Sequence, residues 1–140
     1  SQPISAECVV LGFGDAVGVA RELTSAIGAQ SDVVSQCLAV EQVDSNLVLD
    51  LARRISDSPA TVVVTVEHHY VRGGFGTYLS DALAEIGWKG SIYKWGVTKP
   101  PLGELGDLHF MIEQYCPNIE VMAARVAATV LDEKLSDVGH

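Results

Sequence analysis

The segment that decides the fold is residues 60–66, with the sequence ATVVVTV. Its valines and threonines are β-branched, and such side chains favour extended backbone. The run is continuously apolar in character, which is typical of a strand covered on both faces in a parallel sheet. We therefore predict a central, fully buried strand here.

The segments on either side of this strand alternate between strand-like and helix-like patterns. Apolar runs predict further strands over residues 8–13, 32–40 and 91–97. Apolar residues at helical spacing predict helices over residues 16–27, 44–55, 74–86, 105–115 and 119–135. Within these helices we expect Gly28 to mark a C-terminal stop and Tyr78 to face inward.

This order of elements, with short connections, predicts one α/β domain over residues 1–140. We expect a three-layer α/β/α sandwich around a mainly parallel sheet of about four to five strands.

Composition excludes several classes of protein. A formal net charge of −9 on 140 residues would repel a phosphate backbone, so we expect no nucleic-acid partner. The apolar runs are far shorter than a bilayer span, and the N-terminus lacks the features of a signal peptide, so we expect no membrane partner and a cytoplasmic location. The three cysteines, Cys8, Cys37 and Cys116, are too widely spaced to indicate a zinc site or a disulfide framework.

A first glycine cluster, residues 12–18 (GFGDAVG), follows the first strand, where a dinucleotide-binding fingerprint would lie. Glu41 follows the second strand, in the place of a ribose-binding acid. However, Val17 occupies the slot of the third glycine, and Asp15 would repel a pyrophosphate. We interpret Gly14 as the turn and Asp15 as a helix cap; nucleotide binding stays an alternative.

A second cluster, residues 67–76 (EHHYVRGGFG), follows the central strand. The residues of interest in it are Glu67, His68, His69, Arg72, Gly73, Gly74 and Gly76. Adjacent histidines on a strand point to opposite faces, which disfavours a shared metal ion. An acid–base centre would also lack a clear nucleophile.

Two interpretations of this turn remain. In the first, Glu67 or His69 hydrogen-bonds backbone groups at the turn. In the second, Arg72 and the free N–H groups of Gly74 to Gly76 hold an anion or make a regulatory contact. Gly73 and Gly74 are able to take positive φ there without steric cost.

The run VE-x-HY-x-x-GG-x-G over residues 66–76 resembles the signature of the C-terminal domain of transketolases. Related domains occur in deoxyxylulose-phosphate synthase and in the β subunits of 2-oxo acid dehydrogenases. The likeness extends over nearly the whole chain, through the strand ending in Trp95-Gly96-Val97 and two closing helices. His68 and Arg72 depart from the family pattern.

The resemblance implies a non-catalytic C-terminal domain or subunit of a thiamine diphosphate-dependent enzyme that moves two-carbon ketol units between sugar phosphates. Thiamine diphosphate and Mg²⁺ would bind elsewhere in the complete enzyme, and we expect no cofactor, metal or catalytic residue on this chain. Its partners would be the other domains or subunits, in a homodimer or hetero-oligomer. The alternatives are a stand-alone nucleotide- or anion-binding module and an assembly domain of a 2-oxo acid dehydrogenase.

Overall fold

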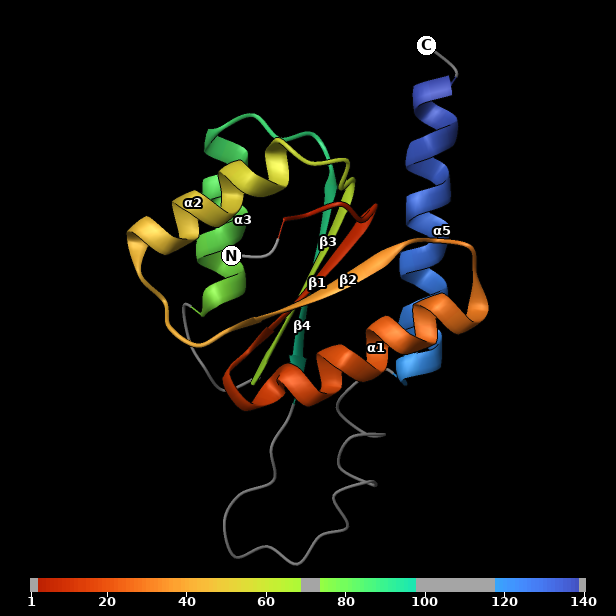
Figure 1. Cartoon of the computed structure of the whole chain (residues 1–140), viewed down its shortest axis with the longest axis horizontal. Helices are drawn as coiled ribbons and strands as arrows, with labels where there is room; N and C mark the ends of the chain where they lie inside the picture. The colour runs from red at the N-terminus through yellow and green to blue at the C-terminus, as the bar shows by residue number, and fades with distance from the viewer. Residues whose placement is uncertain (1–2, 69–73, 98–117, 139–140) are drawn as a thin grey trace, which may run out of the picture.

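The computed structural model describes residues 3–68, 74–97 and 118–138. Its strands form one parallel sheet in the order β2-β1-β3-β4 (Figure 1). The strands are β1 (Cys8–Phe13), β2 (Ser35–Val40), β3 (Val62–His68) and β4 (Ser91–Val97). The central strand starts two residues later than predicted and continues to His68, and the four parallel strands agree with the predicted sheet.

Helices cover both faces of the sheet, which makes the three layers that the sequence predicts. After the short η1 turn (Gly14–Ala16), the helices are α1 (Val17–Gln30), α2 (Ser45–Ser56), α3 (Phe75–Glu85) and α5 (Ile119–Val138). Figure 1 shows α1 and α5 on one face and α2 with α3 on the other. The helix expected over residues 105–115 lies outside the described residues.

The alternation of side chains along β1 and β3 builds two cores, one on each face. Val10 and Val64 lie in the cluster that includes Val126 of α5. Val9 and Val63 lie in the cluster that includes Phe75 of α3. All six are fully buried, so the central strand is covered on both faces, as its continuous apolar sequence predicts.

Local details of the helices differ from the sequence predictions in two places. Helix α1 continues through Gly28 to Gln30, so that glycine is not a stop. Tyr78 was expected to face inward but is 51% exposed. Asp44 caps α2, because its carboxylate accepts hydrogen bonds from the N–H groups of Asn46 and Leu47 at 2.8 and 3.4 Å.

Within the described ranges, no helix is both long enough and apolar enough to cross a membrane.

Candidate functional site

The two glycine clusters lie at the same edge of the sheet, where β1 and β3 end. The register pairs Gly12 of β1 with Val66 of β3, so the residues that follow each strand are close in space. Glu67 and His68 are consecutive on β3 and point to opposite faces. Each therefore meets a different part of the surrounding backbone.

Glu67 points to the face covered by α3 and lies against the start of that helix. Its Oε1 accepts a hydrogen bond from the N–H of Gly76 at 3.3 Å. Gly74, the N-cap residue, has no side chain to do this. A carboxylate at a helix N-terminus also suits the helix dipole. Glu67 thus caps α3 from the neighbouring strand, a contact of the kind that the structural interpretation of the turn expects.

Gly74 and Gly76 are required by the closeness of β3, not by unusual backbone angles. Gly74 has φ of −71°, so positive φ is not needed there, contrary to our expectation. A Cβ on Gly74 would lie 2.8 Å from the Glu67 carboxyl carbon. A Cβ on Gly76 would lie 2.5 Å from Oγ1 of Thr65, a residue buried in β3. The glycines let the helix N-terminus approach the strand.

His68 points to the other face and meets the first glycine cluster. Its Nε2 donates a hydrogen bond to Oδ1 of Asp15 at 2.7 Å. The His68 side chain is 15% exposed and that of Asp15 is 69% exposed. The pair ties the end of β3 to the η1 turn. Asp15 was expected to cap α1, but that helix has no side-chain cap, so this prediction was wrong.

The first cluster is arranged for packing and turning. A Cβ on Gly12 would lie 2.6 Å from Cα of Val17, so the glycine allows α1 to pack closely on β1. Gly14 has φ of +61°, which confirms its role in the turn. Gly18 faces open space, with nothing within 4 Å of a Cβ placed there.

Three residues of the predicted turn site, His69, Arg72 and Gly73, lie outside the described residues. The described members fall into two contacts, Glu67 with Gly74 and Gly76, and His68 with Asp15. An anion at the start of α3 would meet the Glu67 carboxylate, and like charges repel. Within the described part of the turn, this favours a structural or interface role over anion binding.

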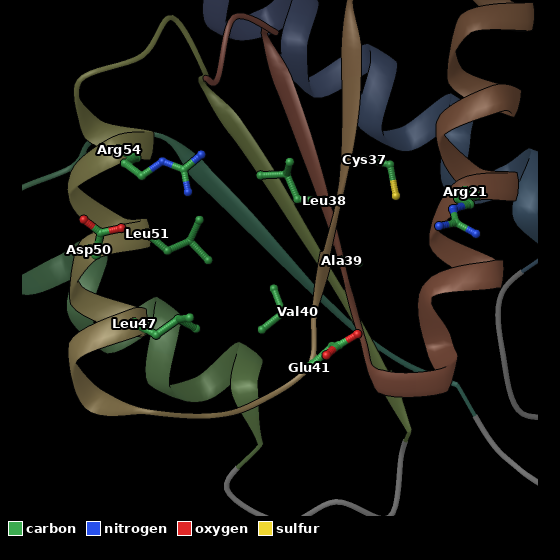
Figure 2. A pocket seen from close by; sticks show the side chains of 10 residues that line it. All are labelled: Arg21, Cys37, Leu38, Ala39, Val40, Glu41, Leu47, Asp50, Leu51 and Arg54. Carbon is green, nitrogen blue, oxygen red and sulfur yellow. The ribbon is translucent and has the colours of Figure 1, made fainter. Parts of the chain in front are cut away.

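A pocket of about 490 Å³ lies along β2, and the sequence pointed to only one of its residues, Glu41. Figure 2 shows Arg21 on α1 and Arg54 on α2, on opposite sides of the strand. The lining residues are Arg21, Cys37, Leu38, Ala39, Val40, Glu41, Leu47, Asp50, Leu51 and Arg54. Cationic, anionic and apolar groups therefore meet in one place. No local motif marks such a pocket, because its two arginines come from different helices that only the fold places on either side of β2.

The cysteines on β1 and β2 are free thiols. Burial raises the pKa of Cys8 to about 12, and the nearby Glu7 carboxylate acts in the same direction. Burial also raises the pKa of Cys37, against a smaller opposite effect of a hydrogen bond with Thr24. Neither thiol has the lowered pKa of a nucleophilic cysteine.

The chain is similar in sequence to a curated protein and in structure to solved proteins. The sequence is 30% identical over 125 residues to "1-deoxy-D-xylulose-5-phosphate synthase 2" of Geobacter sulfurreducens, a match that covers 87% of this chain and 19% of that protein. The chain thus spans about a fifth of the relative. No protein-family model matches the chain.

The solved structure is described as "Split gene transketolase, inactive beta4 tetramer". It matches with a TM-score of 0.64 and 18% identity, over 91% of this chain and 41% of the solved chain. The structural likeness establishes the fold. Together with the sequence relative, it supports a transketolase C-terminal-like domain, as residues 66–76 predict.

Proposed function

We propose that this transketolase C-terminal-like domain is a non-catalytic part of a larger, thiamine diphosphate-dependent enzyme. The complete enzyme would transfer two-carbon ketol units between sugar phosphates, in the cytoplasm. This chain would supply dimer and inter-domain contacts. The sequence and structural relatives support the family, and the chain spans only a minor part of each of them.

The observation that carries the non-catalytic role is how the polar groups of the turn are used. The Glu67 carboxylate is engaged by the N–H of Gly76, and His68 by Asp15. Both contacts join one secondary-structure element to another. A side chain that joins two elements in this way has a structural role, and its loss would lower the stability of the fold without removing a catalytic group.

The described residues do not fit thiamine diphosphate. Each glycine turn presents a carboxylate, Asp15 in one and Glu67 in the other, where a diphosphate would need donors or cations. Asp15 is moreover already paired with His68, so it is not poised to hold a metal ion. We infer that the cofactor belongs to another domain or subunit.

The turn after β3 is, in this proposal, a surface that another domain contacts. Its residues Glu67, His68, Gly74 and Gly76 hold the sheet edge and the start of α3 in a fixed arrangement. The proposed contact would also use His69, Arg72 and Gly73. The solved relative is described as a tetramer, which supports assembly of this chain with a further copy or with other subunits, as a homodimer or hetero-oligomer.

Calorimetry on the purified chain tests this proposal. Thiamine diphosphate with Mg²⁺ is titrated into the chain, and NAD and ATP are titrated separately. We expect no binding heat from any of them. Tight binding of thiamine diphosphate would contradict the assignment of the cofactor to another domain.

A second candidate function is a stand-alone nucleotide- or anion-binding module, and the pocket along β2 is the observation in its favour. Either Arg21 or Arg54 would attract an anion there, with Glu41 just after the end of the strand. Binding of NAD or ATP that is lost on Arg54→Ala would establish this function in place of the first.

A third candidate, an assembly domain of a 2-oxo acid dehydrogenase, shares the fold and differs in substrate. Activity of the assembled enzyme on 2-oxo acids, and not on sugar phosphates, would identify this third function.

A further inference from the structure

Helix α5 carries two separate apolar stripes. One is buried and packs on the sheet and α1, through Met122, Ala123, Val126, Ala127 and Val130. The other faces solvent and consists of Val121, Ala124, Ala128, Leu131 and Leu135, here called the outer stripe. Burial of the first stripe explains how α5 is held, and the second packs on none of the core residues that the structure describes.

The outer stripe follows the spacing of a helix-pairing surface. Its residues recur after three, four, three and four positions, which is the a and d pattern of a coiled-coil heptad. Val121 is 49% exposed, Leu131 51% and Leu135 70%. Three large aliphatic side chains aligned in this way on one exposed helix face indicate a surface that a second helix covers.

With respect to the described residues, the position of α5 leaves room for such a helix. Figure 1 shows α5 at the periphery of the sandwich, with its C-terminal end pointing away from the other elements. At 20 residues the helix is about 30 Å long, so a partner could lie along several turns. The outer stripe lies on the side of α5 away from the buried residues, because the two sets are offset around the helix axis.

We propose that the outer stripe pairs with the outer stripe of a second copy of this chain, with the two α5 helices antiparallel. If Val121, Ala128 and Leu135 are the a residues, then Ala124 and Leu131 are the d residues. In an antiparallel pair the a residues of one helix face d residues of the other. Ala124 then lies opposite the partner's Leu135, and Ala128 opposite the partner's Leu131. Each small side chain meets a large one, which fills the space between the helices evenly.

A parallel pair would fit less well. It would place alanine against alanine at residues 124 and 128, and leucine against leucine at residues 131 and 135. The helices would be too far apart at one end or too close at the other. Side-chain volume thus selects the antiparallel arrangement.

The charges beside the outer stripe agree with this choice. Arg125 and Asp132 are exposed and occupy equivalent heptad positions on one flank of the stripe. In the antiparallel pair, Arg125 and the partner's Asp132 both lie between the Ala124–Leu135 contact and the Ala128–Leu131 contact, so they face each other. The two-fold symmetry of the pair produces this contact twice. For a chain of net charge −9, two such ion pairs offset local repulsion between copies.

This inference rests on the proposed function, because it names one surface and one partner for the assembly role. The test is the mass of the chain in solution, by sedimentation equilibrium or light scattering over a range of concentrations. We expect the unaltered chain to dimerise as concentration rises. Leu131→Glu should abolish the dimer. Tyr78→Glu, at an equally exposed apolar residue on α3, should leave it unchanged.

The charge pair gives a second, independent variant series. Arg125→Asp alone should weaken the dimer, and Arg125→Asp combined with Asp132→Arg should restore it, because the pair is then reversed but complete. Circular dichroism identifies any variant that is unfolded. A chain that stays monomeric, a Leu131→Glu variant that still dimerises, or a double variant that fails to recover would overturn the proposal.

These results are separable from the test of the proposed function. If the chain dimerises through the outer stripe but supports no ketol transfer with any partner, the proposed function fails and the pairing stands. If it supports ketol transfer and Leu131→Glu changes neither mass nor activity, the pairing fails and the proposed function stands.

Discussion

Glu67, the penultimate residue of β3, accepts a hydrogen bond from the N–H of Gly76 in the first turn of α3. The two residues are nine apart in sequence, and the contact joins the central strand to the helix that follows it. Gly74 makes room for the carboxylate that forms this bond. The contact explains why an acid and two glycines occur together at this turn.

The first prediction concerns the fit between Gly74 and Glu67. Gly74→Ala should lower the free energy of unfolding by about 1–2 kcal/mol, because the new Cβ would meet the Glu67 carboxylate. In a Glu67→Ala background the same substitution should cost much less, because the obstacle is gone. Denaturant unfolding of the two single variants and the double variant measures this coupling. Equal costs in both backgrounds would refute the contact.

The second prediction concerns the close approach of α1 to β1 at Gly12. Gly12→Ala should destabilise the chain by about 2–3 kcal/mol, because its Cβ would lie 2.6 Å from the backbone Cα of Val17, which cannot rotate away. Gly18→Ala is the matched control, since it faces open space within α1. It should stabilise the chain by about 0.5–1 kcal/mol. Thermal unfolding distinguishes the two, and similar effects at both positions would contradict the packing argument.

The third prediction concerns the pair between His68 and Asp15. Asp15→Ala should cost about 0.5–1 kcal/mol of stability, because Asp15 is largely exposed and solvent screens the interaction. The same substitution in a His68→Ala background should cost nearly nothing more. The double-mutant cycle by chemical denaturation gives the coupling energy. A coupling of zero would show that the pair does not hold η1 to β3.

The fourth prediction concerns pH and the ion pair between Glu7 and Lys134 of α5. The hydrogen bond with Lys134 is the main cause that lowers the pKa of Glu7 below its usual value near 4.5, and burial opposes it. A lowered folded-state pKa stabilises the fold above the unfolded value, and this stabilisation is lost as pH falls through the folded-state pKa.

Lys134→Met tests this linkage. The variant should lose up to about 1 kcal/mol at neutral pH, as is usual for pairs near the surface, and nothing once Glu7 is protonated. Unfolding free energies measured between neutral pH and about pH 3 give the comparison. A stability difference between variant and parent that does not vary with pH would contradict the assignment.

The sequence predicts those parts of the structure that depend on local chemistry. The buried strand follows from its unbroken β-branched run, and the Asp44 cap and the Gly14 turn follow from side-chain chemistry within a few residues. The contact of Glu67 with the turn was foreseeable because strand and helix are joined by a short connection. Each of these features is set by neighbours in sequence.

Contacts between distant segments were not predictable in the same way. Asp15 and His68 are 53 residues apart, and their pairing depends on the register of β1 against β3. The apolar spacing of α3 predicted that Tyr78 faces inward. The way α3 packs on the sheet leaves this side chain exposed instead. The pocket between Arg21 and Arg54 likewise depends on two helices packing on opposite faces of β2.

The central claim is that this chain supports a ketol transferase without performing the reaction. The most direct test is a ketol-transfer assay with sugar phosphates, thiamine diphosphate and Mg²⁺. The chain is assayed alone and together with a polypeptide that supplies the other domains of a thiamine diphosphate-dependent transketolase. We predict no activity for either polypeptide alone and activity for the two combined. Ketol transfer by this chain alone, or full activity of the other polypeptide without it, would contradict the account.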